Sequence, residues 1–477
     1  MAQNLIAPGL SVFNIGVDAF TQSVVGAGST AIQLDWQPPG DADPRTAWEL
    51  AQLASDADDP KSVGARIDAA NRIAIDRILS SQPILIDVRE ARDVWPDMGR
   101  TLLHAGAPVP WKDMCGPMHG AMIGAVLYEG WASNAEDAMK LLESGKIPFA
   151  SCHDYQAVGP MTGIISATMP VYVVKNDAHG NVAYTNVNEG IGKVLRFGAN
   201  SPEVIARLRW FKNVLAPTIK AALDAVGGID LKAIQSQALL MGDEVHSRNT
   251  AATALFHMAL STALAKANID GARAYGVLKF IADTSQFFLN FSMVSSKAIM
   301  DAAHGIEYST IVTATARNGV TTGIRVSGLG QEWFEAPSDT PVGLYFPGFK
   351  REDANPDLGD SAICETAGFG GFSFAASPAL TLLAGGTVAQ SMRYSREMYH
   401  ITVGRNPAMS LPALDFAPAP VGIDVRQVVD TGIRPIVTTG IAHKQAGIGQ
   451  VGAGVVRVPM ACYVSALHAF AQRYAVA

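Results

Sequence analysis

The segment from Met241 to Phe256, MGDEVHSRNTAATALF, carries the densest group of reactive side chains in the chain. Seven residues from Asp243 hold two carboxylates, a histidine, an arginine and an asparagine, although only 17% of all residues are charged. A stretch rich in Ala and Leu follows without a formal charge as far as Lys266. Because an Asp side chain accepts hydrogen bonds from backbone N–H groups at a helix start, we expect Asp243 to cap a helix. The pattern predicts a helix whose first turn carries the polar groups.

On such a helix the polar residues fall on two faces. Glu244 and Arg248 form an i, i+4 pair with the acid on the N-terminal side, an order that stabilises helices, and we interpret this pair as structural. The other face is uncharged, and it either lines a cleft or is satisfied within the core. Its members follow the spacing of one helix face: His246, Asn249, Thr250, Thr253 and His257.

Length and composition predict a globular protein with three or four domains. The chain has 477 residues, 48% of them hydrophobic, and its mean hydropathy is +0.17, which excludes a disordered protein. The segment from Ala251 to Ala265 is the nearest to a membrane span, but it is too short and contains polar residues. The start of the chain, MAQNLIAPGL, lacks the pattern of a signal peptide. We therefore expect a soluble, cytoplasmic protein with no membrane partner.

Charge and cysteine usage exclude further classes of protein. The net charge of −7, without a basic stripe, argues against nucleic acid as a partner. The cysteines Cys115, Cys152, Cys364 and Cys462 are scattered, so neither a zinc site nor a disulfide framework is indicated. No cofactor and no metal site is predicted, although the sequence leaves open whether a metal is bound. The 45 glycines indicate loops where backbone N–H groups come close to a ligand.

The first 200 residues are expected to form two α/β domains, residues 1–105 and 106–200. Strand, helix and strand follow one another from Ser11 to Trp36, with Asp35 near the end of the second strand. This order is Rossmann-like, but only Gly16 stands in the first turn, so the G-x-G-x-x-G fingerprint of dinucleotide binding is missing.

Three features are predicted in the second of these domains, residues 106–200. We expect a close-packed helix that opens at Pro117, and an antiparallel pair formed by Val171–Val174 and Val182–Val187. His153 stands in a loop beside Cys152. We discount a nucleophilic Cys–His pair, because neighbours in sequence rarely face each other, and take His153 as a candidate ligand contact.

Residues 201–305 are predicted to form a small all-helical domain. Ser201 and Pro202 mark a helix start, with the serine as cap and the proline at the first helical position. In a later helix Asn290 and Lys297 share one face. Lys297 is either a lysine that extends to the surface or an anion contact in a cleft.

Residues 306–477 are predicted to form a glycine-rich C-terminal α/β domain. Asn318 and Gly319 lie between two β-branched runs, which indicates a two-residue hairpin turn, with Arg317 and Arg325 on its strands. Gly447, Gly449 and Gly452 match G-x-G-x-x-G, but a strand rather than a helix follows them, so the dinucleotide context fails. This loop is either a structural turn or a nest of N–H donors for an anion, beside His443. The predicted fold is α/β (α+β multidomain), with two or three α/β domains around the helical one.

Blocks along nearly the whole chain resemble one family, the AllG-like subunit of oxamate carbamoyltransferase, long catalogued as a domain of unknown function. The blocks are NIGVDAF, LDWQPP, LLHAGAPVPW, CGPMHGAMIGA, SCHDYQAVGPMTG, NEGIGKVLRFG, MGDEVHSRNTAAT, FFLNFSM, TARNGV with GIRVSG, GLYFPGF, PDLGDSAICETAGFGGF and TTGIAHKQAGIGQVGAG.

The resemblance implies carbamoyl transfer between phosphate and an amide or amine nitrogen, as in phosphorolysis of oxalurate to oxamate and carbamoyl phosphate during purine and allantoin catabolism. It also implies a hetero-oligomer with two further subunits, one of them resembling acyl-CoA synthetases; a homo-oligomer stays open. The resemblance does not identify which residues of this chain are catalytic. The S-T-R-T and H-P-x-Q motifs of aspartate and ornithine transcarbamylases are absent, so another scaffold must perform this chemistry.

This chemistry requires donors for a developing oxyanion, a site for phosphate, an arginine for a carboxylate and a group that handles the nitrogen proton. We assign acid/base catalysis and the oxyanion donor to His246 and Asn249, with Asp243 beside them. The loop Gly368–Gly371 or the loop Gly447–Gly454 holds phosphate, through donors of the kind that bind anions at helix starts. The candidate substrate-binding residues are His153, Asn290, Lys297, Arg317, Arg325, Thr366, Gly370, Gly371, His443 and Gly449.

Two other functions remain open from the sequence. One is a metal-dependent amidohydrolase of ureido or cyclic amide compounds, with Asp243, His246 and His443 as ligands; D-x-x-H gives two ligands, but no third is fixed. The other is a non-catalytic subunit that orders the active site of a partner.

Overall fold

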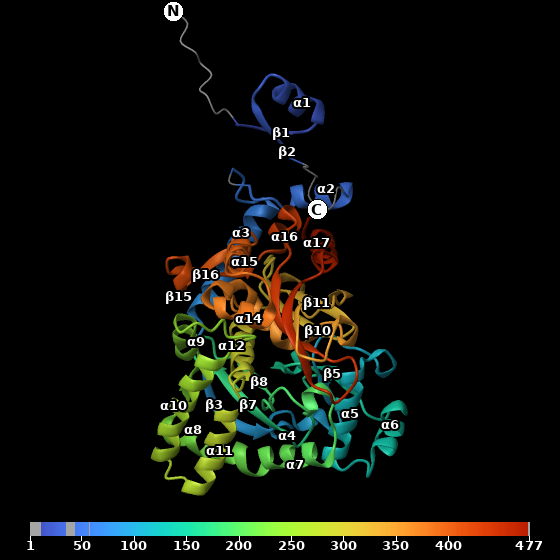
Figure 1. Ribbon diagram of the computed structural model, residues 1–477, viewed down its shortest axis with the longest axis vertical. Coiled ribbons are helices and arrows are strands. Elements are labelled where there is room, and N and C mark those ends of the chain that lie inside the picture. The colour runs from blue at the N-terminus through green and yellow to red at the C-terminus, as the bar shows by residue number, and fades with distance from the viewer. Residues whose placement is uncertain (1–10, 35–42, 57, 476–477) are drawn as a thin grey trace, which may run out of the picture.

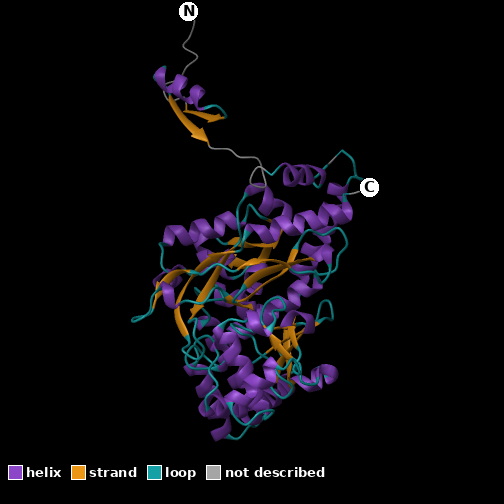
Figure 2. Ribbon diagram, turned by 90° about the vertical axis from the view of Figure 1, so that its right-hand side faces the viewer, coloured by secondary structure: helices purple, strands orange, loops and turns teal. Residues whose placement is uncertain are grey.

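A computed structural model describes residues 11–34, 43–56 and 58–475 of the chain. Helices and strands alternate over several sheets (Figure 1), and Figure 2 shows the strands between an upper and a lower group of helices. The predicted mixed α/β class is therefore confirmed. Within these described ranges, no helix is long and apolar enough to cross a membrane.

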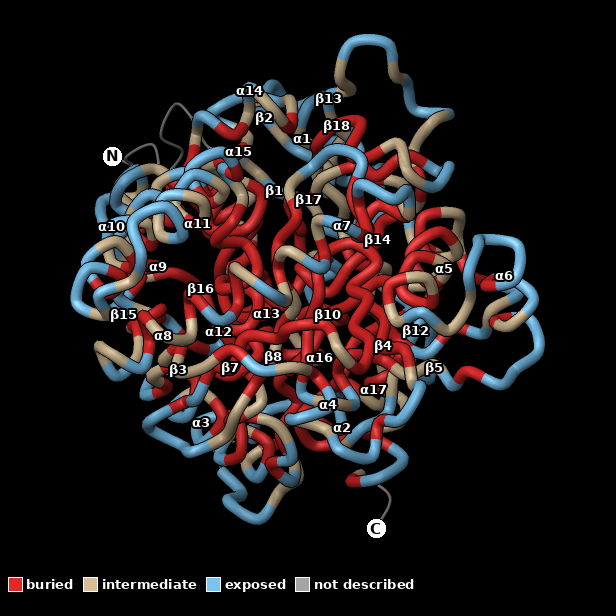
Figure 3. Tube along the Cα trace, turned by 90° about the horizontal axis from the view of Figure 1, so that it is seen from below, coloured by how far each residue is buried: buried red, intermediate tan, exposed pale blue. Residues whose placement is uncertain are grey.

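Helix α12 (Leu289–Ala302) is the centre of the core. All of its residues except Asp301 are buried, and it packs against helix α13 (Ile363–Thr366) and several strands. Figure 3 shows buried residues concentrated around these two helices. Because the helix is enclosed, Lys297 is only 4% exposed, and the interpretation of this residue as a surface lysine is wrong.

The largest sheet has the strand order β6-β8-β7-β3-β9. Strands β7 and β8 form the predicted antiparallel pair, and β3 lies antiparallel on the other side of β7. The sheet thus joins segments on both sides of residues 105 and 200, while the division into four domains stays a prediction. The strands are β3 (Pro83–Glu90), β6 (Ala157–Val158), β7 (Pro170–Asn176), β8 (Val182–Thr185) and β9 (Ile229–Asp230).

Three antiparallel sheets follow in the C-terminal part of the chain, ordered β12-β11-β10-β14, β13-β18-β17 and β15-β16. The predicted turn is confirmed: Oδ1 of Asn318 accepts hydrogen bonds from the N–H groups of Val320 and Thr321, and Gly319 has a φ of +82°. The strands are β10 (Val312–Asn318), β11 (Thr321–Val326), β12 (Phe334–Pro337), β13 (Val342–Tyr345), β14 (Leu358–Gly359), β15 (Thr402–Leu411), β16 (Ala417–Ile423), β17 (Ile436–Ala442) and β18 (Gln450–Arg457).

The other helices surround these sheets (Figure 1). Helix α5 opens with Pro117 in its first turn, as predicted, and a π-helical segment, Phe211–Leu215, joins α7 to α8. The helices around the sheets are α2 (Pro44–Gln52), α3 (Val63–Ser80), α4 (Ala91–Val94), α5 (Gly116–Glu129), α6 (Ala135–Glu143), α7 (Pro202–Trp210), α8 (Ala216–Val226), α9 (Leu231–Leu240), α10 (Thr250–Lys266), α11 (Gly271–Asp283), α14 (Thr381–Ala384), α15 (Val388–Met398), α16 (Val425–Thr431) and α17 (Met460–Tyr474).

The N-terminal unit consists of strand β1 (Ser11–Ile15), helix α1 (Asp18–Gly26) and strand β2 (Thr30–Leu34). The predicted order of strand, helix and strand is confirmed, and the two strands are parallel. Asp35 lies outside the described residues. None of the residues of α1 is buried, so the helix adds nothing to the core.

The prediction of a helix across residues 243–249 is wrong. Helix α10 begins only at Thr250, because the two carboxylates before it bind backbone N–H groups, a competition that interrupts helices. Asp243 does act as a cap, but across nine residues: its Oδ2 accepts from the N–H of Ala252 at 2.9 Å. Glu244 accepts from the backbone instead of pairing with Arg248, whose Nε lies 3.3 Å from Asp243. The uncharged stripe from His246 to His257 is therefore not one helix face.

Candidate functional site

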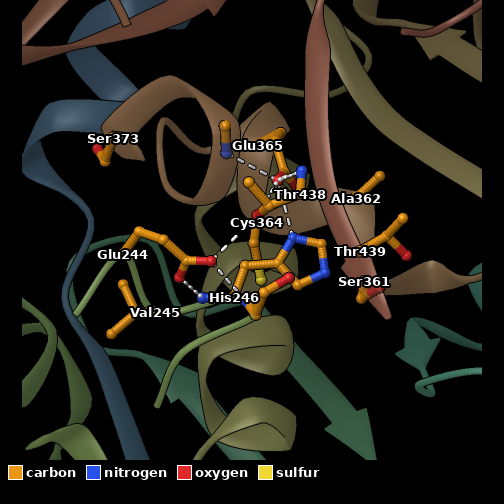
Figure 4. A network of polar contacts seen from close by, with 12 residues as sticks. Glu244, Val245, His246, Ser361, Ala362, Cys364, Glu365, Ser373, Thr438 and Thr439 are labelled. Carbon is orange, nitrogen blue, oxygen red and sulfur yellow. Dashed lines mark hydrogen bonds and ion pairs between the residues drawn. The ribbon is translucent and has the colours of Figure 1, made fainter. Parts of the chain in front are cut away.

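Two buried carboxylates and one imidazole form a polar cluster (Figure 4). We call Glu244, His246, Glu365 and Thr438 the His246 cluster. Nδ1 of His246 lies 2.8 Å from Oε1 of Glu365, and the backbone N–H of His246 donates to Glu244 at 2.8 Å. The Thr438 hydroxyl is 3.1 Å from a Glu244 oxygen and 3.3 Å from a Glu365 oxygen. The imidazole is thus held by charge-assisted contacts rather than enclosed in apolar surroundings.

The loop of residues 368–371, which we call the glycine loop, supplies backbone N–H donors to this cluster. Gly371 donates its N–H to Glu365 at 2.9 Å, and Gly370 donates to the backbone oxygen of Glu244 at 2.8 Å. A Cβ on Gly370 would stand 1.9 Å from Glu365 Oε1, so only glycine fits. These two N–H groups, predicted to hold phosphate, are engaged by acceptors of the chain itself.

Burial changes the electrostatics of the cluster. Removal of Glu244 from water raises the pKa of its carboxyl to about 7, and the neighbouring Glu365 adds to this rise. Glu244 therefore exchanges a proton near neutral pH. The cluster can store or release a proton beside an imidazole whose orientation Glu365 fixes.

Arg317 lies next to the His246 cluster, and its Nε and Nη2 bind neighbouring side chains, whereas its buried Nη1 has no hydrogen-bond partner among the described residues. Its guanidinium contacts both oxygens of Asp357, at 2.7 and 3.2 Å, and the hydroxyl of Thr439 at 3.3 Å. The side chain is 1% exposed. This pair therefore stabilises the junction of β10, β14 and β17.

A cavity of about 460 Å³ lies between α12, β10 and β11, and we call it the His153 cavity. It brings together three of the predicted substrate-binding residues, His153, Lys297 and Arg325. The complete lining is His153, Asp154, Gln156, Lys297, Asp301, His304, Thr313, Ala314, Arg325 and Gln331.

The charges of the cavity come in pairs. Nζ of Lys297 lies 2.7 Å from Asp301, and the guanidinium of Arg325 binds Asp154 and stacks over Trp333. Each cation is nearly buried, whereas its acid partner is more open to solvent. The cavity thus offers donors and acceptors side by side.

His153 has the most unusual position in the cavity. The residue is 2% exposed, and neither ring nitrogen makes a hydrogen bond with any described residue; the nearest acid, Asp360, lies 3.5 Å from Nε2. Burial lowers the pKa of His153, and the nearby Lys297 lowers it further. The imidazole is therefore neutral at physiological pH.

Asp360, which lies behind the cavity, and His304, which lines it, were not found from the sequence. Asp360 accepts hydrogen bonds from the N–H groups of Gly106 at 2.7 Å and Gly159 at 3.0 Å, beside His153. His304 donates to or accepts from Thr313 at 2.7 Å, and burial lowers its pKa to about 4. Sequence reasoning also missed Glu365, although it is the only charged residue between Asp360 and Arg393.

Strand β10 connects the His153 cavity with the His246 cluster. Thr313 lines the cavity, and Thr315, two residues further and on the same face, binds the hydroxyl of Thr366 at 3.1 Å. Thr366 follows Glu365 in helix α13. The predicted residue Thr366 therefore lies between the cavity and the His246 cluster.

The other predicted residues have structural partners. Nδ2 of Asn249 donates to the backbone oxygen of His246 at 2.5 Å, and Asn290 donates to the backbone oxygen of Asn186 at 2.7 Å. Nδ1 of His443 accepts from the N–H of Gln445, and a Cβ on Gly449 would meet Gly192 at 2.8 Å. Within the described residues, no three His, Cys, Asp or Glu side chains are placed to hold a metal ion.

Comparisons with known proteins relate the chain to one family. Residues 147–361, which include every residue that lines the His153 cavity, match the family described as oxamate carbamoyltransferase subunit AllG. The chain is 49% identical to the Escherichia coli (strain K12) oxamate carbamoyltransferase subunit AllG over 407 residues, which are 84% of this chain and 97% of that protein. It is 44% identical to the uncharacterized protein YahG of the same organism over 477 residues, 100% of both chains.

A solved structure shows the same fold. The crystal structure of a conserved protein of unknown function from Enterococcus faecalis V583 matches with a TM-score of 0.85 and 44% identity, over 87% of this chain and 99% of that chain. The extent of the match to AllG is decisive, because nearly all of that protein aligns. The chain belongs to the family of the oxamate carbamoyltransferase subunit AllG.

Proposed function

We propose that the chain is a subunit of an oxamate carbamoyltransferase-like enzyme, which moves a carbamoyl group between phosphate and oxamate or a related amide or ureido acid. The observation that carries the proposal is the 49% identity over 97% of the AllG subunit. The position of all cavity-lining residues inside the matched segment supports it.

In the proposed reaction, the amide nitrogen of oxamate forms a bond to the carbamoyl carbon of carbamoyl phosphate. The bond between that carbon and the phosphate oxygen breaks, and phosphate leaves with the electron pair. The nitrogen gives up one proton, so the products are oxalurate and hydrogen phosphate. The catabolic direction is the reverse, phosphorolysis of oxalurate, in the breakdown of purine-derived nitrogen compounds. Carbamoyl phosphate and phosphate are substrates here, and the proposal requires no cofactor.

His153 handles the amide proton in this proposal, because it is the neutral imidazole inside the cavity, with both ring nitrogens free of partners among the described residues. The carboxylate of Asp360 lies 3.5 Å from Nε2 of His153. The sequence assigns the same role to His246 with Asn249 and Asp243. The two assignments differ in which histidine the reaction rate depends on.

The proposed enzyme is a complex. We propose that this chain works with two further subunits, one of which resembles acyl-CoA synthetases, and that the complex acts in the cytoplasm. The AllG protein is itself named as a subunit. The site can therefore include groups from another chain, such as those that bind phosphate.

The test is a reconstituted enzyme with and without this chain. Oxamate-dependent release of phosphate from carbamoyl phosphate should require the chain, and oxalurate plus phosphate should yield carbamoyl phosphate in reverse. His153→Gln should lower kcat by about 100-fold, the usual scale of general acid–base catalysis, while His257→Gln serves as a matched histidine control on a partly exposed helix face. His246→Gln tests the second assignment in the same assay. Full transfer activity without this chain would refute the proposal, and carbamoyl hydrolysis without an acceptor would identify a hydrolase instead.

A further inference from the structure

The His153 cavity contains buried polar atoms that no part of the described structure satisfies. Both ring nitrogens of His153 and Nε of Arg325 lack a hydrogen-bond partner among the described residues. The two residues are 2% and 4% exposed. Because buried polar groups in proteins are nearly always hydrogen-bonded, unpaired groups that line a cavity mark the place of a ligand.

The charges of the cavity set the kind of ligand. Lys297 and Arg325 have side chains that are 5% exposed, while their partners Asp301 and Asp154 are 19% and 38% exposed. The cations thus lie at the more enclosed end and the carboxylates toward solvent. A ligand carboxylate fits at the cations, and ligand N–H groups fit at the carboxylates.

The balance of charge argues against a multiply charged anion. Lys297 and Arg325 are offset by Asp154 and Asp301. His304, with a pKa of about 4, adds no positive charge at neutral pH. A phosphate dianion would face two carboxylates without a surplus of cations, whereas a monoanion with N–H donors matches both kinds of group.

We infer that the His153 cavity binds one small monoanionic amide or ureido acid, with its carboxylate at Arg325 and Lys297 and its N–H groups at Asp154 and Asp301. The inference rests on the proposed function for the choice of acid, and it assigns the acid, not phosphate, to this cavity. Oxamate is the simplest acid of this class.

Binding to the full chain tests the inference directly. Calorimetry should show that oxamate binds at least tenfold more tightly than oxalate, which has a second carboxylate in place of the amide, and than inorganic phosphate. Arg325→Gln and Lys297→Met should each weaken oxamate binding at least tenfold, because each removes a charge-assisted contact. Lys279→Met is the matched control, since Lys279 forms the same i, i+4 pair, with Asp283, on an exposed surface of α11.

The carboxylates provide a second, opposite test. Asp154→Asn removes a negative charge from the cavity, so the preference for oxamate over oxalate should shrink. A wild-type chain that binds phosphate or oxalate as tightly as oxamate overturns the inference. So does unchanged oxamate binding in Arg325→Gln, provided that thermal unfolding shows the variant to be folded.

The assembled enzyme separates this inference from the proposed function. There, Arg325→Gln should raise the KM for oxamate at least tenfold, with a smaller change in the KM for carbamoyl phosphate. If carbamoyl transfer proceeds with an unchanged KM for oxamate, the cavity assignment is wrong and the function stands. If oxamate binding depends on Arg325 but no carbamoyl transfer occurs, the function is wrong and the binding site stands.

Discussion

Oε1 of Glu365 lies 2.8 Å from Nδ1 of His246, although the two residues are 119 positions apart in the sequence. The same carboxylate oxygen accepts hydrogen bonds from the N–H groups of Gly371 and Thr438. One side chain thus joins the loop before α10, the glycine loop and strand β17. Its removal affects all three segments together.

Replacing Glu365 by Gln should destabilise the protein by about 3 kcal/mol, because the amide cannot accept every hydrogen bond that the carboxylate accepts. Urea unfolding measures this change. Glu332→Gln, at an exposed position, is the control and should change the free energy of unfolding by less than about 0.5 kcal/mol. Equal effects of the two variants would contradict the role of Glu365 in joining the segments.

Asp243 is predicted to stabilise the start of α10 through its bond to the N–H of Ala252. Asp243→Ala should lower the free energy of unfolding by about 1–2 kcal/mol, whereas Asp243→Asn, which keeps an acceptor oxygen, should cost clearly less. Thermal or urea unfolding of the two variants makes the comparison. A loss of the same size in both would show that the charge, not the cap, is what matters.

Glu244 should make stability fall as pH rises. Its pKa is about 7 in the folded protein against an ordinary value of 4.5, so the folded state binds the proton more tightly than the unfolded state. Its contribution is present below pH 4.5 and is lost as pH rises through 7. Glu244→Gln removes it, so the variant should gain up to about 3 kcal/mol relative to wild type between pH 4.5 and 7. Parallel pH profiles of the two proteins would contradict this.

His304 should have the opposite effect. Its pKa is lowered from 6.5 to about 4 by burial, so the unfolded state binds the proton more tightly, and stability rises with pH across that window. Because Glu244 and His304 oppose each other, the wild-type curve alone shows neither. His304→Gln should flatten the rise between pH 4 and 6.5, by up to about 3 kcal/mol, in urea unfolding measured at each pH. An unchanged slope in this variant would mean that the pKa of His304 is not lowered in the folded protein.

The buried pair of Arg317 and Asp357 should be costly to break. Arg317→Met leaves an unpaired carboxylate in the core and should cost about 3–5 kcal/mol, and Arg317→Met combined with Asp357→Leu should recover part of that loss. Denaturant unfolding measures both. The exposed pair of Arg89 and Asp87 is the control, since Arg89→Met should cost less than about 1 kcal/mol. Failure of the double variant to recover stability would point to lost packing rather than lost charge.

Sequence signals predicted the elements whose cause is local. Pro117 at the start of α5, Pro202 at the start of α7, and the turn at Asn318 and Gly319 all act within a few residues. Ser201 stands at the predicted cap position, but its hydroxyl donates to Glu203 instead of capping the backbone, so that part of the prediction is wrong. The mixed fold class follows from the same kind of signal. Glycine and proline limit the backbone wherever they occur, so these predictions do not depend on distant contacts.

The candidate site depends on contacts that no local pattern contains. Residues 243–249 look helical, but Glu244 binds backbone groups there because Thr438 and the glycine loop hold it from other parts of the chain. Likewise, the sequence indicates His153, Lys297 and Arg325 as separate candidates for substrate binding. Only the packing of α12 against β10 and β11 brings them into one cavity. Residue types could be predicted, while their neighbours could not.

Asp360 ties Gly106, Gly159 and the wall that carries His153 to a single side chain. Movement of this segment would break two buried hydrogen bonds, so we expect the His153 cavity to have the same shape before and after a ligand binds. We therefore expect ligand association to be a single step, with an observed rate that grows linearly with ligand concentration and without a slow closing phase, in stopped-flow measurements.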